Sequence, residues 1–125
     1  MGGPLPRKQV WNGWISTIGQ WSILGMGAWA VDLTATGECI GEVAITRPLD
    51  YPETELGWLL YDGFEGFGYA FEAAQAAKAF ALSSIRPLSL VSYIDPDNQR
   101  SIRLAERLGA VRDTAAATPN NDPCL

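Results

Sequence analysis

The chain has 125 residues, 47% of them hydrophobic, and no apolar stretch long enough to cross a bilayer, which predicts one globular domain over residues 1–125. Its formal net charge of −5 argues against a nucleic-acid partner. Two cysteines without paired spacing and the absence of histidine argue against a zinc or thiol enzyme. We expect no metal and no membrane partner. Because Met1-Gly-Gly-Pro lacks the features of a signal region, we also expect a cytoplasmic protein.

The first half of the chain predicts a helix followed by a hairpin. Residues 6–19 follow a proline and alternate apolar and polar residues at helical spacing, which is typical of an amphipathic helix. Alternating apolar residues over 29–33 predict a strand, the cluster 34–37 a turn, and Cys39 to Ile45 a second strand. The apolar positions assigned to the helix and its end are Val10, Trp14, Ile18 and Trp21.

The second half predicts two strands and two helices. Arg47 to Thr54 contains two prolines and is assigned to a loop, and the apolar run Leu56 to Leu60 to a buried strand. The alanine-rich segment Tyr69 to Leu82 predicts a helix, Leu88 to Ile94 a strand, and Asn98 to Leu108 a final helix. The fold class is therefore α/β, a mixed sheet with helices on both faces, in the order helix-strand-strand-strand-helix-strand-helix.

The turn between Leu60 and Tyr69 has the features of an anion-binding site. A strand followed by a glycine turn and a helix leaves main-chain N–H groups unpaired at the positive end of the helix dipole. Gly66 and Gly68 would let a diphosphate approach the main chain closely, and Ala70 keeps the first helical turn thin. An ordinary loop that starts a helix has the same composition, so the pattern alone leaves both interpretations open.

Three segments in register carry a more specific resemblance. They are Glu55-Leu-Gly-Trp-Leu-Leu, Gly66-Phe-Gly-Tyr-Ala-Phe-Glu-Ala, and Ile94-Asp-Pro-Asp-Asn followed by Ser101 and Leu108-Gly. In this order, over about residues 21–109, the chain resembles the GNAT superfamily of N-acetyltransferases, in its RimJ/RimL-type branch. The resemblance also implies that a first strand and helix and a final strand are missing, so that the domain is incomplete at both ends or completed by another chain.

The resemblance implies a site for acetyl-CoA as co-substrate. The main chain of the glycine turn would bind the pyrophosphate, and the preceding strand would splay from its neighbour so that pantetheine pairs with its edge. Asn98 matches an asparagine that contacts pantetheine or fixes the strand-to-helix turn, and it would equally serve as a helix cap alone. The cofactor-binding residues implied are Leu59, Leu60, Tyr61, Gly66, Phe67, Gly68, Tyr69, Ala70, Asn98 and Ser101.

The implied reaction is direct attack of a neutral amine on the thioester, which requires a base and an acid. Relatives often use a tyrosine as the acid, but its position is Ala105 here, so Ser101 is the candidate acid, with hydrogen bonding to cofactor or backbone as the alternative role. Glu55 is the candidate base and Glu42 the second choice, although either could be an ordinary solvated carboxylate.

The distribution of charge bears on the acceptor. Residues 32–72 hold nine carboxylates and the single base Arg47, whereas residues 98–112 hold four arginines and one glutamate. Carboxylates around an acceptor groove would attract a cationic amine, which favours a primary amine or a protein N-terminus as substrate. A solubilising acidic surface would have the same composition.

Three residues depart from the family pattern at the phosphate site. Glu65 stands where relatives have Gln or Arg, Phe67 where they have Lys or Arg, and Phe71 where they often have Thr, and each change disfavours phosphate. We therefore expect weak coenzyme A binding. The function predicted is N-acetyl transfer from acetyl-CoA by a homodimer, and the alternative is a non-catalytic acyl-CoA-binding or protein-interaction module with the same fold.

Overall fold

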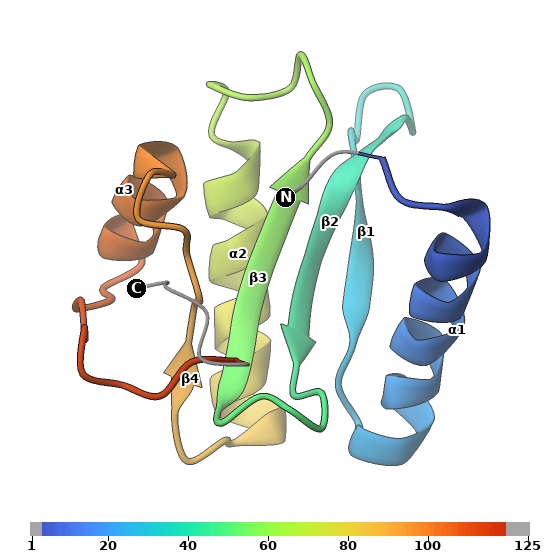
Figure 1. Cartoon of the computed structure of the whole chain (residues 1–125). Helices are drawn as coiled ribbons and strands as arrows, with labels where there is room; N and C mark the ends of the chain where they lie inside the picture. Colours follow the sequence, from blue (N-terminus) through green and yellow to red (C-terminus); the bar gives the residue numbers. More distant parts are fainter. Residues whose placement is uncertain (1–3, 120–125) are drawn as a thin grey trace.

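A computed structural model of the chain describes residues 4–119 (Figure 1). Within them the chain forms a four-stranded mixed sheet and three α-helices in the predicted order, which confirms the α/β fold class. The elements are α1 (Arg7–Leu24), β1 (Ala28–Asp32), β2 (Cys39–Thr46), β3 (Thr54–Leu60), α2 (Tyr69–Phe80), a π-helical turn (Ala81–Ile85), β4 (Leu90–Val91) and α3 (Gln99–Arg107).

The strands lie in the order β1-β2-β3-β4. β1 and β2 form the predicted antiparallel hairpin, β2 and β3 are also antiparallel, and β3 and β4 are parallel. β2 and β3 lie so close at Gly41 that an added Cβ would collide with the main-chain carbonyl of Leu59. Glycine is therefore required at this position by the space between the strands and not by its own dihedral angles.

The core lies between the sheet and α2. Alternate residues of β2 and β3, among them Val43, Ile45 and Leu56, point towards this helix. α2 meets them with small side chains, of which Ala74 and Ala77 are buried, so the helix axis comes close to the sheet. Complete burial of a side chain such as Ile45 stabilises the fold by about 1.5–3 kcal/mol.

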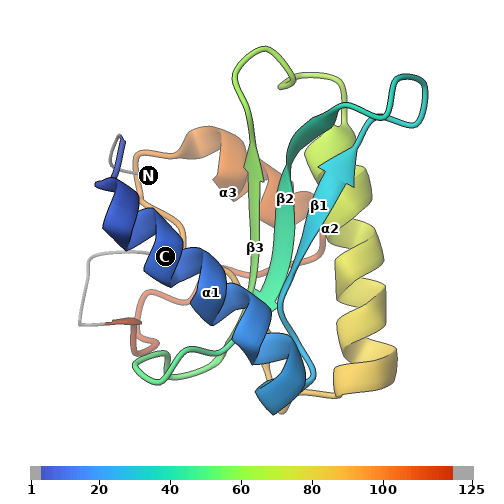
Figure 2. The ribbon, with the colours of Figure 1, turned by 90° about the vertical axis from the view of Figure 1, so that its right-hand side faces the viewer.

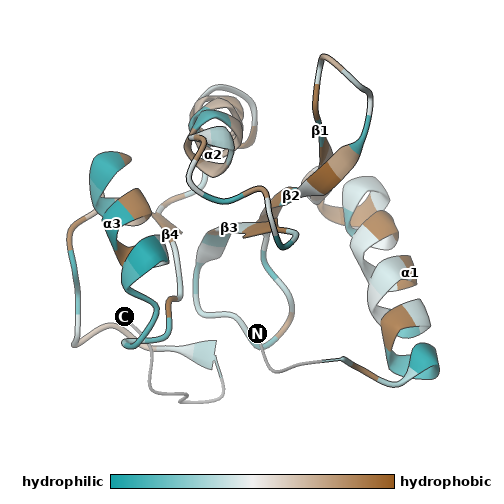
Figure 3. Ribbon diagram, turned by 90° about the horizontal axis from the view of Figure 1, so that it is seen from above, coloured by the Kyte–Doolittle hydropathy of each residue, from teal (hydrophilic) through white to brown (hydrophobic). Residues whose placement is uncertain are grey.

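α1 lies on the other side of the sheet from α2 (Figures 2 and 3). The predicted helix is present and extends to Leu24, beyond its predicted end at residue 19, but none of its residues is buried, and Val10, Trp14 and Ile18 are about half exposed. Its C-terminal end is held by Trp21, whose ring lies edge-on against Trp29 and whose indole N–H donates to a carbonyl of β1 at 3.2 Å.

Several predicted boundaries shift. β3 begins at Thr54, inside the predicted loop, and α2 gives way to the π-helical turn after Phe80, two residues before its predicted end at Leu82. β4 is much shorter than the predicted strand over 88–94 because side chains replace its ladder: the hydroxyl of Ser92 donates to the Leu56 carbonyl at 2.6 Å. None of the helices described has the length and hydropathy needed to cross a membrane.

Candidate active site

β3 and β4 pair through two residues each and then part from each other. Their pairing consists of Thr54 with Leu90 and Glu55 with Val91, and no strand among the described residues pairs with this edge of β3 beyond Glu55. Beyond these pairs the two strands diverge on the side of the glycine turn, and we call the region between their backbones there the opening. The splay that the family resemblance implied is therefore present in the backbone.

The main-chain groups that face this opening can be identified from the ladder. The N–H of Tyr61 donates to Ile40 at 2.8 Å, so Tyr61, Leu59 and every second residue before them bond towards β2. The intervening residues, Trp58 and Leu60, direct their N–H and C=O groups towards the opening. Of the three edge residues predicted, Leu60 presents its main chain there, and Trp58 is a position that the sequence reasoning missed.

The glycine turn forms an open cradle at the start of α2. Gly66 and Gly68 have φ values of 87° and 83°, in the left-handed region, and an added Cβ at either would meet nothing within 4 Å. Gly68 is the N-cap of α2 and has no side chain to satisfy the first N–H groups, which are those of Tyr69, Ala70 and their neighbours. The cradle therefore has the space and the dipole that a diphosphate needs.

A stacked aromatic pair, of which Phe67 is the exposed member, flanks the cradle. Phe67 is 68% exposed and stacks on Tyr69, with 5.6 Å between the ring centroids. Phe71, the third departure from the family pattern, instead packs against the core and lies under the guanidinium of Arg107, 4.1 Å from the ring centroid. Phe71 thus joins α2 to α3, while Phe67 places an uncharged ring where the resemblance implied a cation.

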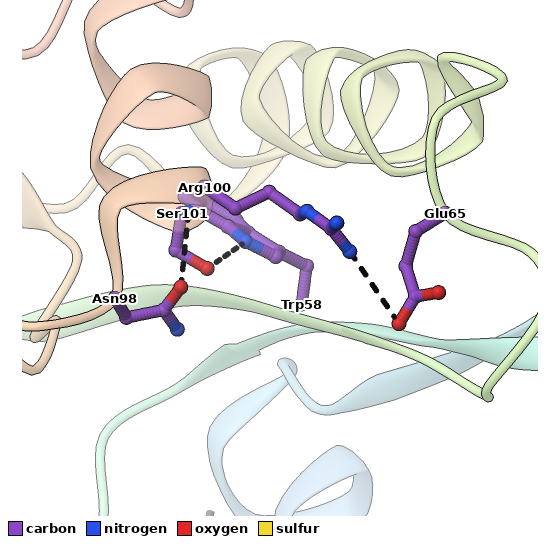
Figure 4. Close-up of polar contacts among 5 residues, drawn as sticks. All are labelled: Trp58, Glu65, Asn98, Arg100 and Ser101. Carbon is purple, nitrogen blue, oxygen red and sulfur yellow. Dashed lines mark hydrogen bonds and ion pairs between the residues drawn. The ribbon is translucent and has the colours of Figure 1, made fainter.

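Ser101 and Asn98 lie together at the start of α3 (Figure 4). The Asn98 Oδ1 accepts from the main-chain N–H of Ser101 at 3.2 Å, which makes Asn98 the N-cap of this helix. The Trp58 Nε1–H donates to the Ser101 Oγ at 3.2 Å. Because an indole nitrogen only donates, the Ser101 hydroxyl accepts this bond and its own hydrogen remains available for another partner.

Ala105, where the resemblance implied a tyrosine, belongs to the core. Ala105, one helical turn after Ser101, is 7% exposed and packs in a small cluster with Ile94 and Ile102. Trp58 packs against the same cluster and against the main core. A partly buried tryptophan usually has a partner for its N–H, which is Ser101 here, and because this burial appears only in the fold, no sequence signal identified the contact.

Glu55 lies where the strands part. Its Oε2 accepts from the main-chain N–H of Tyr93 at 3.1 Å, in place of a ladder bond, and burial raises the pKa of its carboxyl above the ordinary glutamate value, more than the Tyr93 bond lowers it. By strand alternation Glu55 and Glu42 share the sheet face opposite Trp58. The structure thus places Glu55 and Ser101 on different faces, without a hydrogen bond between them.

Comparison with known proteins places the chain among acetyltransferases. Residues 1–111 match the profile of the acetyltransferase (GNAT) domain family. The crystal structure of an acetyltransferase from Agrobacterium tumefaciens superposes with a TM-score of 0.91 and 41% identity, covering 98% of this chain and 72% of that one.

Two curated Bacillus subtilis proteins are also similar. YkkB, a protein of uncharacterised function, is 32% identical over 68% of this chain and 51% of its own length. The N-acetyltransferase YnaD, which is also uncharacterised, is 26% identical over 59% and 44%. The chain therefore spans about half the length of the curated relatives it matches.

Proposed function

Because this chain belongs to the GNAT acetyltransferase family, we propose that it transfers an acetyl group from acetyl-CoA to a primary amine, either a small amine or a protein N-terminus. The observation that carries the proposal is the opening between β3 and β4, which runs from the glycine cradle to Glu55. In this proposal it provides an anion site at one end and, beyond Leu56, whose carbonyl accepts from Ser92, an edge of β3 at Trp58 and Leu60 that pairs with no strand among the described residues.

The donor would bind by its main-chain contacts. In this proposal the pyrophosphate occupies the cradle of Gly66 and Gly68, where the N-terminus of α2 favours an anion. The pantetheine arm extends along the edge that Trp58 and Leu60 present. From Leu60 to Glu55 the strand covers about 17 Å, so an extended arm that enters from the cradle leads its thioester towards the point where the strands part.

The chemistry requires two proton transfers. The neutral amine attacks the thioester carbon, the new C–N bond forms, and the C–S bond breaks as the thiolate leaves. We assign removal of the ammonium proton to Glu55, whose raised pKa makes it a stronger base than an ordinary glutamate. We assign protonation of the thiolate to Ser101, whose hydroxyl hydrogen is left available by the bond from Trp58; as the hydroxyl gives this proton to sulfur it takes another from water, so that no alkoxide is left.

The acceptor would approach the face of the sheet opposite α2. Glu42 is exposed on this face and pairs with Leu59, which lies between Trp58 and Leu60 in β3. Glu55 lies on the same face. Two carboxylates on one face attract a cationic amine before it is deprotonated. The resemblance to the RimJ/RimL-type branch adds protein N-termini to the small amines that satisfy this charge requirement.

The test is release of free thiol from acetyl-CoA in the presence of a panel of amines that includes polyamines, amino acids and N-terminal peptides. We expect release that depends on both one amine and the protein, and loss of release when Gly68 is replaced by Val. Titration of acetyl-CoA without an amine tests the alternative function. Binding of acetyl-CoA without turnover of any amine would favour the non-catalytic module, and Ala105, where the resemblance implied a tyrosine, would then account for the missing turnover.

A further inference from the structure

An ion pair crosses the mouth of the opening, from the glycine turn to α3. The Nη1 of Arg100 lies 3.6 Å from the Oε1 of Glu65 (Figure 4). Glu65 immediately precedes Gly66, and Arg100 is in the first turn of α3, next to Ser101. The pair therefore joins the two segments between which the proposed phosphate site lies.

The pair is built so that it opens easily. The side chains of Arg100 and Glu65 are 69% and 35% exposed, and the separation is longer than a direct hydrogen bond. Exposed ion pairs of this kind contribute little to stability. Breaking it therefore costs the fold little, and either partner is free to take a better one.

Arg100 is also poorly placed for stability alone. A cation in the first turn of a helix is opposed by the helix dipole, and α3 has no acidic residue in its first turn to compensate. Glu65, from the other side of the mouth, is the carboxylate that offsets this charge. A phosphate group bound beside Gly66 would offset it better, because a guanidinium binds phosphate through two parallel hydrogen bonds.

We propose that Glu65 holds Arg100 at the mouth of the opening and that Arg100 exchanges this carboxylate for the phosphates of the acyl donor when the donor binds. This inference rests on the proposed function. It assigns Arg100 as a specificity-determining residue for phosphate and Glu65 as its internal competitor. It also revises the expectation drawn from sequence, since Glu65 weakens donor binding by occupying Arg100 and not only by repelling the diphosphate.

Titration calorimetry with acetyl-CoA and with S-acetylpantetheine, which has no phosphate, tests the exchange. At low salt we expect Glu65→Gln to tighten acetyl-CoA binding about three- to tenfold and Arg100→Gln to weaken it by at least as much. Binding of S-acetylpantetheine should be unchanged in both variants. Arg103→Gln, which removes the same charge from the next turn of α3, is the matched control and should have the smaller effect.

The double variant Glu65→Gln/Arg100→Gln is decisive. If Glu65 acts through Arg100, its removal no longer tightens binding once Arg100 is gone. An equal gain in both backgrounds, or equal losses in Arg100→Gln and Arg103→Gln, would overturn the inference and leave the proposed function intact. A folded wild-type protein that binds no acetyl-CoA at any salt concentration would overturn both.

Discussion

Replacement of Ser101 by Ala separates its two possible roles by magnitude. The change removes the Oγ alone, because the bond that caps α3 runs from the main-chain N–H of Ser101 to Asn98 and survives. What is lost is the acceptor of the Trp58 Nε1–H, a neutral hydrogen bond of 3.2 Å. A bond of this kind is worth about 1 kcal/mol, so the free energy of unfolding should fall by no more than about 1–3 kcal/mol and the variant should remain folded.

The effect on turnover depends on what the hydroxyl does. If Ser101 only contacts the donor, losing about 1 kcal/mol should raise KM or lower kcat by less than about tenfold. If Ser101 protonates the leaving thiolate, kcat should fall by about 10²–10⁴, with little change in the affinity for acetyl-CoA. We expect the larger effect on kcat.

The assay is steady-state thiol release with the best amine of the panel, together with thermal unfolding of each variant. Trp58→Phe is the matched control, because it removes the indole N–H and retains the Ser101 hydroxyl. Its kcat should fall less than that of Ser101→Ala. A loss in Ser101→Ala below tenfold, or equal losses in the two variants, would refute the assignment of Ser101 as the acid.

Three further predictions concern the base, the sheet and the donor site. Glu55→Gln should lower kcat and remove the acidic limb from the pH profile of kcat. In the wild type, the raised pKa of this carboxyl should make the free energy of unfolding fall as pH rises above the ordinary glutamate range, and thermal unfolding of the variant should lack this fall. Gly41→Ala should cost about 3 kcal/mol or more in urea unfolding, because its Cβ collides with β3, whereas Gly13→Ala in the open interior of α1 should stabilise by about 0.5–1 kcal/mol. Phe67→Lys should tighten acetyl-CoA binding about two- to tenfold in calorimetry, and Leu49→Lys, which adds the same charge at a fully exposed position elsewhere, should not.

The elements with strong local signals could be predicted from sequence. The alanine-rich α2 and the capped α3 have propensity and end signals that act within a few residues, and α3 starts at Gln99, one residue after its predicted start at Asn98, which is its cap. β4 could not be predicted, because its length is set by residues far away in sequence. The apolar run after Leu88 suits a strand, but the Glu55 carboxylate takes the N–H of Tyr93 and the strand ends.

The residues of the candidate site likewise fall into those that local sequence predicts and those that only the fold brings together. The glycine cradle is encoded by residues whose special conformations are local, so Gly66 and Gly68 could be identified directly. The relation between Trp58 and Ser101 joins residues 43 positions apart, and the pair Glu65 and Arg100 joins β3's exit to α3. The spacing of apolar and polar residues along the sequence does not predict such long-range contacts. They arise only once the parallel crossover brings the ends of β3 and β4 to one side of the sheet.

Trp58 ties the geometry of the opening to the stability of the fold. Two backbone groups that could have continued the parallel ladder are taken by side chains, at Ser92 and at Glu55. Beyond them the space between the strands is bordered by Trp58, which packs against both hydrophobic clusters. The same indole donates to the Ser101 hydroxyl, so the position of the proposed acid depends on how this side chain packs. Substitutions of Trp58 that widen the opening for a larger acyl group should therefore also loosen the packing of α3.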